Sequence, residues 1–357
     1  MPTLPTLVHL DAPREIPLGA PFRIRGWIAS ERPIVAVRAG RTTLALEPRE
    51  DVRAAKREYE HVSGFAGVVD ASALAGEIVR LTCECAGEAA FGWEQRLAPV
   101  AVPANKARRL ARIRPRLCAD RAFDETAFHF NFLTPEQRTA FAIDLSAAIS
   151  SHDYGPAALE LIERHRDGLV LDAGAGLRRD DRPNVVTVEI FPFASTDVLA
   201  VNEALPFLDD TFDATISCAV LEHVKDPFAA ARELVRVTKP GGTIYADVPF
   251  LQPYHGYPSH YYNMTSQGLA NLFAGTCEIE RTAVPVYGRP IWSLTWFLNR
   301  YLEGLPPAAR EKFREMKVGD LLARPETYEA EEFVRALPEA KNFELASVTS
   351  VWAVKKK

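Results

Sequence analysis

The strongest structural signal in the chain is a series of apolar runs between residues 168 and 250. Four of these runs are almost continuously apolar: GLVLDAG, NVVTVEIF, FDATISCAV and GGTIYADVPF. The segment DPFAAARELVRVTK, which separates the last two, has the spacing of an amphipathic helix. Strands that are buried on both faces have this continuous apolar character, and in parallel sheets they alternate with helices. The pattern therefore predicts an α/β fold with a parallel sheet and helices on both of its faces.

Residues 1–102 have a different pattern, made of short strand-like runs separated by Pro, Gly and Asp. Examples are PFRIRGWIAS, PIVAVRAG, TTLALEP and EIVRLTCECAG. Short strands at close and regular spacing are typical of a sandwich, so we expect a separate N-terminal all-β domain. We expect a basic linker and a helix at 103–150, followed by the α/β domain at 151–357.

Basic residues are concentrated just after the first domain. Six of the eleven residues at 106–116 are Lys or Arg. A solvated linker or helix face is the usual structure of such a tract, and the alternative is an anion patch for a membrane surface, an acidic glycan or RNA. Further along, Thr134, Pro135 and Gln137 have the spacing of a capping box, which predicts that a helix begins at Pro135.

Composition narrows the classes of function. The chain has 357 residues, 47% of them hydrophobic, and a net charge of −5. Nucleic-acid-binding domains are usually basic, so we do not expect nucleic acid as a partner. No run approaches the roughly 18–20 apolar residues of a membrane span, and the N-terminus lacks the features of a signal peptide.

The cysteines indicate the redox environment. Cys83 and Cys85 would lie on the same face of a strand, as two packed thiols rather than as metal ligands. The histidines do not have the Cys or carboxylate spacing of a zinc site. We therefore expect a reduced, cytoplasmic protein without a bound metal.

A glycine turn, DAGAGLRR at residues 172–179, follows the first of the apolar runs. Gly174 and Gly176 occupy the first two glycine positions of a dinucleotide-binding turn, but Arg179 takes the third. Asp172 ends the strand, where its carboxylate would repel a pyrophosphate and suit an ammonium group. Seventeen positions later, Glu189 ends the next run and can accept hydrogen bonds from both ribose hydroxyls. These features fit a nucleoside with a cationic tail, such as S-adenosylmethionine.

Residues 168–275 resemble the class I S-adenosylmethionine-dependent methyltransferases, in particular the branch that contains the small-molecule type-11 enzymes. The motifs VLDAGAG, VEIFP, NEALPFLDDTFDATISCAVLEHVKDP and ELVRVTKPGGTIYADVPF follow the order and spacing of that family. The resemblance implies a Rossmann-like sheet of seven strands that ends in an antiparallel hairpin. CEIERTAVPVYG and FELASVTSVWAVKK would be the sixth and seventh strands, with a helical insertion at 290–342.

The resemblance also assigns cofactor contacts, which fall to Asp172, Ala173, Gly174, Gly176, Glu189, Ile190, Asn202, Cys218 and Glu222. The first four would face the methionine end, Glu189 the ribose and Ile190 the adenine. Relatives often have an Asp for the adenine amino group where this chain has Val201 and Asn202, and only Asn202 could make that contact. Cys218 would lie near the sulfonium. The alternative roles are structural: a tight turn for the glycines, core packing for Cys218 and supporting contacts for Glu222 and its neighbour.

Methyl transfer to an amine or a hydroxyl can require a general base, and histidine suits that task. The candidates are His223, which follows Glu222, and His255 and His260 of the segment QPYHGYPSHYYNMT at 252–265. This segment follows the fifth strand, at the edge where open α/β sheets bind ligands. Its aromatic rings could stack on a sugar or stabilise a cation, which makes Tyr254, Tyr257 and Tyr261 candidates for substrate binding. The alternative is a tyrosine-rich loop that packs over the sheet edge.

The insertion opens with the apolar segment IWSLTWFLNRYLEGL. Ile291, Leu294, Leu298 and Tyr301 share one helical stripe, with two tryptophans beside it. We expect a core or lid helix. The alternatives are a dimer face, which would make the protein a homo-oligomer, and a membrane-surface contact.

The class of acceptor is suggested by the first 102 residues. Through FRIRGWIAS, PREDVRAAKREYEHVSGF and IVRLTCECAGE they resemble the Ig-like β-domain that accompanies some bacterial glycosyltransferases. Together with the aromatic loop, this resemblance implies O-methylation of a sugar or of a surface-polysaccharide intermediate. The alternatives are a methyltransferase for a lipid, a quinone or another small metabolite, and a non-catalytic binding protein that keeps the fold. A nucleic-acid methyltransferase is supported only by the basic tract.

Overall fold

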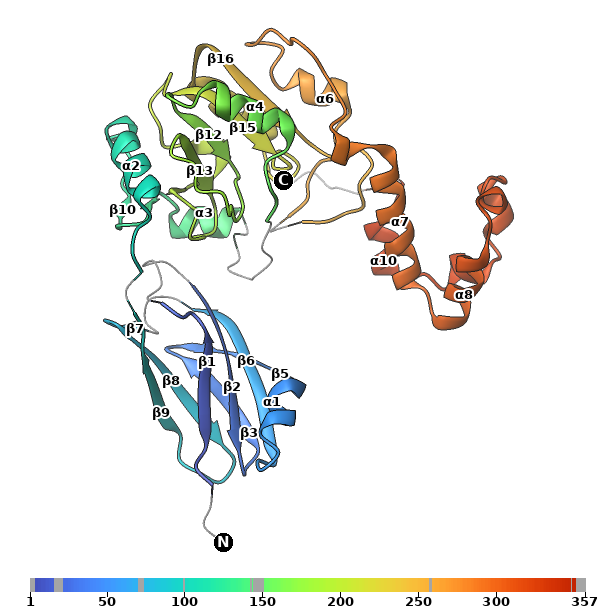
Figure 1. The fold of residues 1–357 in the computed structure, drawn as a ribbon. Helices are drawn as coiled ribbons and strands as arrows, with labels where there is room; N and C mark the ends of the chain where they lie inside the picture. The colour runs from blue at the N-terminus through green and yellow to red at the C-terminus, as the bar shows by residue number, and fades with distance from the viewer. Residues whose placement is uncertain are drawn as a thin grey trace, which may run out of the picture. The chain divides into compact units, whose positions relative to one another are not determined.

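The computed structural model describes residues 4–15, 22–69, 74–98, 100–141, 143, 151–256, 259–347 and 349–350 (Figure 1). Contacts within the chain divide it into two compact units. The first unit contains residues 1–218 and 233–245, and the second contains residues 219–232 and 246–357. The predicted domain boundaries at 102 and 150 stay predictions. No helix of the described ranges has both the length and the apolar content needed to cross a membrane.

The first hundred residues form two antiparallel sheets, with orders β1-β2-β6-β5 and β4-β3-β8-β7, and β9 pairs with β8. The strands are β1 Leu7–Ala12, β2 Phe22–Ser30, β3 Ile34–Ala39, β4 Thr42–Thr43, β5 Ala45–Glu47, β6 His61–Val69, β7 Leu74–Ala75, β8 Ile78–Cys85 and β9 Phe91–Arg96, with one short helix, α1 Glu50–Ala55. Both sheets contribute to one apolar core, in which Ile24 and Phe65 of one sheet join Val37 and Leu81 of the other. The antiparallel strands of this part agree with the prediction, while a separate all-β domain and its likeness to an Ig-like domain stay predictions.

The cysteine pair of β8 lies in this core. Cys83 and Cys85 are both buried, and neither forms a disulfide. Burial raises the pKa of Cys83 to about 12. The prediction of two packed thiols is therefore confirmed.

The α/β part is built on a seven-stranded sheet of order β10-β11-β14-β13-β12-β15-β16. Its strands are β10 Asp124–Glu125, β11 Phe130–Asn131, β12 Val170–Ala173, β13 Val185–Glu189, β14 Val198–Leu199, β15 Phe212–Cys218 and β16 Thr238–Asp247. The pairs from β11 through β14, β13 and β12 to β15 are parallel, whereas β10 and β11 are antiparallel. The four predicted apolar runs correspond to β12, β13, β15 and β16, and helix α5 Pro227–Val237 connects the last two. This confirms the predicted α/β fold with a parallel-containing sheet.

Between β9 and β12 the described residues form α2 Ala104–Ile113, α3 Pro135–Ala140 and α4 Pro156–Arg164, and the short 3-10 turn η2 Arg114–Arg116 continues α2. Helix α4 packs Ala158, Leu161 and Ile162 against Val170 and Ile216 of the sheet. The capping box of α3 is as predicted, since Thr134 accepts a hydrogen bond from the Gln137 amide and Gln137 accepts one from the Thr134 amide.

The predicted sixth strand is wrong. Residues 277–285 form no strand, and Ile279 and Val284 are exposed. Strand propensity depends on a partner strand alongside, and no strand of the described residues pairs with this segment. The segment predicted as the seventh strand, 343–356, begins inside helix α10 Glu339–Glu344, and residues 348 and 351–356 of it lie outside the described residues. Two other short strands, β10 and β11, complete the sheet instead at its opposite edge.

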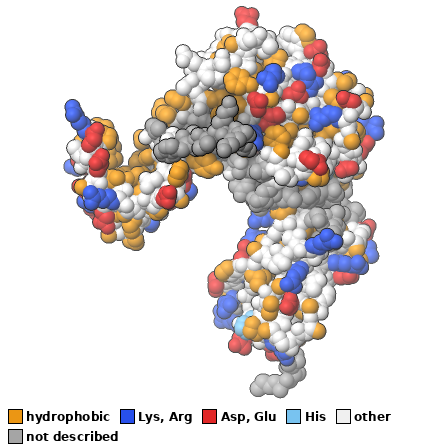
Figure 2. Space-filling model, turned by 180° about the vertical axis from the view of Figure 1, so that it is seen from behind, with side chains coloured by type: hydrophobic (Ala, Val, Ile, Leu, Met, Phe, Trp, Pro, Cys, Tyr) orange, Lys and Arg blue, Asp and Glu red, His pale blue; other side chains and the backbone are white. Residues whose placement is uncertain are grey.

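The insertion at 290–342 is helical, as predicted. After α6 Ser266–Asn271 and η4 Val286–Gly288, its elements are α7 Pro290–Gly304, α8 Pro307–Glu315, η5 Val318–Leu321, η6 Pro325–Tyr328 and α9 Glu332–Arg335, followed by α10. Leu298 and Tyr301 of α7 pack onto a core formed with α8 and α9. Ile291, Trp292 and Leu294 are 60%, 58% and 54% exposed. Figure 2 shows that apolar side chains lie among charged ones on the surface of the protein. The expectation of a core helix therefore holds for the second half of α7 only.

Candidate functional site

The glycine turn follows β12 directly and is tied to the neighbouring strand. Gly174 and Gly176 have positive φ angles of +83° and +62°, which favour glycine. The amides of Gly174 and Ala175 both donate to the carbonyl of Val188, at 2.9 and 3.0 Å. The two glycines are thus required by the backbone, and their contact with the cofactor stays a prediction.

Glu189, at the end of β13, holds the other side of this turn. Its two carboxylate oxygens accept hydrogen bonds from the amides of Gly176 and Ile190, each at 2.7 Å. Burial raises the pKa of the Glu189 carboxyl, while these two hydrogen bonds oppose the shift. A carboxylate oxygen can accept two hydrogen bonds, so each oxygen retains one accepting position. Two positions of this kind would suit the two hydroxyls of a ribose, a contact that stays a prediction.

Asp172 is already paired within the protein, which the sequence analysis did not foresee. Its carboxylate accepts hydrogen bonds from the Tyr154 hydroxyl at 2.7 Å and from Arg178 Nε at 2.8 Å. Asp172, Arg178 and Tyr154 are all buried, and the guanidinium lies 4.2 Å from the centre of the Tyr154 ring. The charge of the Asp172 carboxylate is therefore neutralised inside the protein by Arg178. The structural effect of this ion pair is to hold the loop that contains Arg178.

No helix connects β12 to β13. Residues 174–184 form an irregular connection of eleven residues, and residues 190–197 connect β13 to β14 in eight. Parallel strands usually need a dozen or more residues, most often with a helix. Dinucleotide-binding folds place the positive end of such a helix at the pyrophosphate, and this turn has none. The short spacing between the first two apolar runs was the sequence signal for this departure.

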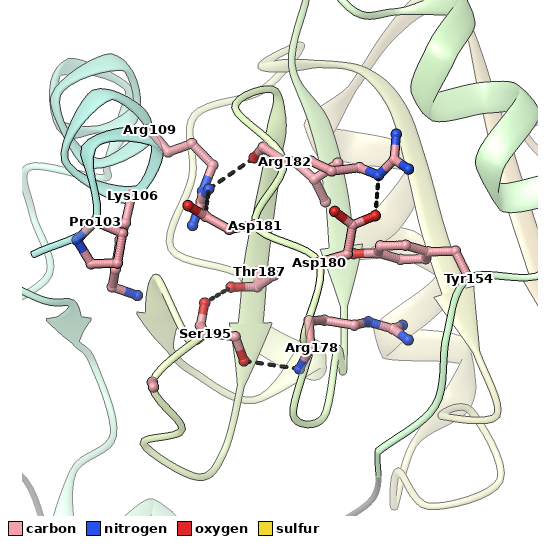
Figure 3. A pocket seen from close by; sticks show the side chains of 12 residues that line it. Pro103, Lys106, Arg109, Tyr154, Arg178, Asp180, Asp181, Arg182, Thr187 and Ser195 are labelled. Carbon is pink, nitrogen blue, oxygen red and sulfur yellow. Dashed lines mark hydrogen bonds and ion pairs between the residues drawn. The ribbon is translucent and has the colours of Figure 1, made fainter.

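A pocket of about 170 Å³ lies beside this connection (Figure 3). It is lined by residues of α2, of the β12–β13 connection and of the segment before β14, among them Lys106, Arg109, Arg178, Asp181 and Ser195. Neither glycine of the turn lines it, and neither does Glu189. The pocket is therefore distinct from the predicted cofactor contacts.

The expectation of a solvated face holds for part of the basic tract, in which Arg108, Arg114 and Arg116 are exposed, but two other cations form a buried ion-pair network. Lys106 and Arg109 are 1% and 3% exposed and form ion pairs with Asp197 at 3.2 and 2.8 Å. Arg109 also pairs with Asp181, as Figure 3 shows. Farther along, Arg114 pairs with Glu125. Because these cations have internal partners, the interpretation as an anion patch loses its main support.

The remaining cofactor candidates of the first unit lie at strand ends. Ile190 packs in one apolar cluster with Val201, and the buried Asn202 begins the short 3-10 turn η3 Asn202–Ala204. Ala173 is the last residue of β12, and Cys218, the last of β15, is partly buried beside the core under α4. Their contacts with a cofactor stay predictions.

The second unit brings the three predicted histidines together. The ring centres of His223 and His255 are 5.2 Å apart, and those of His255 and His260 are 4.2 Å apart. Tyr254 stacks on His260 at 5.6 Å, Tyr261 is largely exposed, and the predicted Tyr257 lies outside the described residues. The sequence analysis named these histidines separately and gave no reason to expect one cluster.

Glu222 lies beneath this cluster and is fully buried. Burial, together with the nearby Asp247, raises the pKa of Glu222 to about 8. Burial lowers the pKa of His223 to about 4, so this imidazole is neutral at pH 7. Its Nε2 lies 3.7 Å from Glu222 Oε1. The cluster thus combines the neutral imidazole of His223 with a buried carboxyl group.

A family model and curated relatives match part of the chain. Residues 169–246 match the family model of a methyltransferase domain. An uncharacterised methyltransferase of Mycobacterium leprae is 41% identical over 69 residues, which are 19% of this chain and 26% of the relative. One of Mycobacterium tuberculosis is 43% identical over 68 residues, 18% of this chain and 27% of the relative. The chain thus spans about a quarter of the length of these curated relatives.

Solved structures also match part of the chain. A SAM-dependent methyltransferase of Thermotoga maritima is 20% identical, with 30% of this chain and 62% of that one covered and a TM-score of 0.24. The [4+2]-cyclase SpnF is 18% identical, with 56% and 83% covered and a TM-score of 0.32. The domain match supports S-adenosylmethionine as the cofactor.

Proposed function

We propose that the chain is an S-adenosylmethionine-dependent methyltransferase that methylates a hydroxyl of a sugar or of a polysaccharide intermediate. The match of residues 169–246 to a methyltransferase domain carries this proposal. The glycine turn supports it, because the turn lacks the helix that would favour a pyrophosphate. Glu189 supports it as well, since its two remaining accepting positions suit a ribose.

The bound cofactor supplies a methyl group that its sulfonium has already activated. The protein then has to bind the cofactor and to align the acceptor with it. Glu189 would accept hydrogen bonds from the two ribose hydroxyls, while the hydrogen bonds that it accepts from the amides of Gly176 and Ile190 hold it against the turn. Ile190, which is only partly buried, would offer apolar surface to the adenine, with the buried Val201 packed behind it. Asp172 acts through Arg178, which keeps the connection after the turn in place.

The sugar acceptor rests on two features. One is the resemblance of the first 102 residues to the β-domain that accompanies glycosyltransferases. The other is the aromatic segment at 252–265, in which Tyr254 and Tyr261 expose flat rings that can stack on a sugar. His223, His255 and His260 stay the sequence-based candidates for a general base, and a metal ion bound by the first two would exclude them from that role.

Calorimetric titration with S-adenosylmethionine and with its demethylated product tests the cofactor site. We expect the wild type to bind both. Glu189→Ala removes two hydrogen bonds to ribose at about 1 kcal/mol each, so affinity should fall about 30-fold. Glu160→Ala, which removes an exposed acid of α4, is the control and should bind as the wild type does. If the folded wild type binds neither compound, the non-catalytic alternative replaces this proposal.

A lipid or another apolar metabolite is the second candidate acceptor. It is favoured by the exposed Ile291, Trp292 and Leu294 at the start of α7. Incubating the protein and S-adenosylmethionine with nucleotide sugars and, separately, with a lipid extract distinguishes the two by mass spectrometry. A methylated sugar supports the first proposal, and a methylated lipid supports the second.

A further inference from the structure

We propose that Glu222, His223 and His255 form a binding site for one divalent transition-metal ion, for which Zn²⁺ is the best fit. The three residues belong to the second unit, and the site does not depend on the proposed methyltransferase function. The proposal replaces the sequence-based expectation of a protein without metal. That expectation rested on spacing, and His255 lies too far along the chain from the other two residues to form a motif with them.

The donor atoms are already close to one another. One atom from each of the three residues can be chosen so that all lie within 4.8 Å of one another, and His223 Nε2 lies 3.7 Å from Glu222 Oε1. In a tetrahedral zinc site with bonds of about 2.0–2.1 Å, neighbouring ligand atoms are about 3.4 Å apart. The three side chains therefore need to move by only about an ångström to enclose an ion.

Both imidazoles are oriented as metal ligands are. His223 Nδ1 lies 2.8 Å from the carbonyl of Ser259, and His255 Nδ1 lies 2.9 Å from the carbonyl of Pro253. A carbonyl can only accept, so each Nδ1 carries the proton and each Nε2 presents its lone pair. Metal-binding histidines commonly donate their other N–H to a backbone carbonyl in this way, which fixes the tautomer and the ring orientation.

Glu222 provides an independent observation. Its side chain is 0% exposed, and within the described residues neither carboxylate oxygen has a hydrogen-bond partner. A buried polar group without a partner is costly, and a buried charge is normally paired or coordinates a metal. A cation held between Glu222 and the two Nε2 atoms would satisfy both the carboxylate and the lone pairs.

His260 is the nearest alternative ligand, and its two nitrogens are already used. Its Nδ1 accepts a hydrogen bond from the His255 amide at 3.0 Å, and its Nε2 lies 3.0 Å from Asn263 Oδ1. It therefore positions the segment that carries His255 without entering the ligand set. Two imidazoles and one carboxylate suit Zn²⁺ and similar transition metals, whereas Mg²⁺ and Ca²⁺ prefer oxygen ligands. Three protein ligands leave a fourth position for water or another oxygen ligand.

Titration of the chelator-treated full chain with Zn²⁺ and with Co²⁺ tests the site. We expect one equivalent of either ion to bind, with a visible absorption band for Co²⁺ and no competition from Mg²⁺. Glu222→Gln and His255→Ala each remove a ligand. Their affinity should fall by more than the roughly 10–100-fold that loss of a supporting hydrogen bond costs. His260→Asn keeps an acceptor for the His255 amide and should retain the Co²⁺ band.

Thermal unfolding separates loss of the site from loss of the fold. Without metal, Glu222→Gln should melt close to the wild-type temperature, because it replaces a buried carboxyl group without a hydrogen-bond partner by a side chain of the same shape. Zn²⁺ should raise the melting temperature of the wild type and of His260→Asn, but not of Glu222→Gln. The proposal is overturned if the wild type binds no stoichiometric metal, if both ligand variants bind as the wild type does, or if His260→Asn loses binding equally.

Discussion

The buried pair of Asp172 and Arg178 makes a quantitative prediction about stability. Arg178→Met removes the guanidinium and leaves Asp172, which is fully buried, with the Tyr154 hydroxyl as its other hydrogen-bond donor at 2.7 Å. Breaking a buried pair from one side typically costs about 3–5 kcal/mol, because an uncompensated charge remains inside the protein. At about 2–4 °C per kcal/mol, the melting temperature of the α/β part should fall by roughly 6–20 °C.

The assay is thermal unfolding followed by circular dichroism, with two further variants. Arg179→Met changes the exposed neighbour in the same connection and should melt within about 2 °C of the wild type. The double variant Asp172→Asn with Arg178→Met removes both charges and should recover most of the loss, since no unpaired charge is left. Equal melting temperatures for Arg178→Met and Arg179→Met would refute the reasoning, and so would a double variant that is less stable than Arg178→Met.

Three further predictions concern other parts of the chain. Burial lowers the pKa of His129 to about 4, whereas the unfolded pKa is about 6.5. Protonation of this imidazole therefore favours the unfolded state, and its contribution to stability is complete only above about pH 6.5. Between about pH 7 and pH 5 it should remove about 2 kcal/mol of the free energy of unfolding. Urea titrations at both pH values should show this loss in the wild type and less of it in His129→Asn. An equal loss of unfolding free energy in the two proteins would contradict the assignment. Thr134→Ala removes a helix cap and should cost about 1 kcal/mol in the same urea assay, whereas the exposed Glu136→Gln should cost less. At pH 8, alkylation read by peptide mass spectrometry should modify the half-exposed Cys277 well before Cys83, because burial shields the Cys83 thiol and raises its pKa; equal rates would contradict its burial.

Features that depend on local sequence were predictable. The strands β12, β13, β15 and β16 follow from continuous apolar runs, because a strand buried on both faces has no polar side to interrupt the pattern. The start of α3 follows from Thr134 and Gln137, whose reciprocal hydrogen bonds join residues three positions apart. In both cases the interaction that decides the structure lies within the segment itself.

Features that depend on distant partners were not predictable. A lysine such as Lys106 is normally expected at the solvent-exposed surface. Its burial depends on Asp197, which lies 91 positions later in the chain. Arg178 is close to Asp172 in sequence, but only a turn without a following helix brings its guanidinium back onto the carboxylate. The histidine cluster shows the same limit, since His255 reaches His223 only through the path of the loop. The strand predicted around Ile279 is wrong for the converse reason. Its segment has the residue types of a strand, but no strand of the described structure pairs with it.

The helix-free connections of β12, β13 and β14 have a consequence for the order of folding. Val170 pairs with Val185 and Val188 pairs with Val198, so these parallel strands meet after closing very short loops. Loop closure of this kind is fast and carries a small entropic penalty. Helix α2 forms ion pairs with Asp197, the residue before β14, across 88–91 positions of the chain, so we expect it to dock late. Until α2 docks, Asp197 stays hydrated and lacks its ion pairs with Lys106 and Arg109. Amide exchange in α2 should therefore occur through one cooperative opening whose free energy is lower than that of global unfolding. The amides of β12 and β13 should remain protected during this opening.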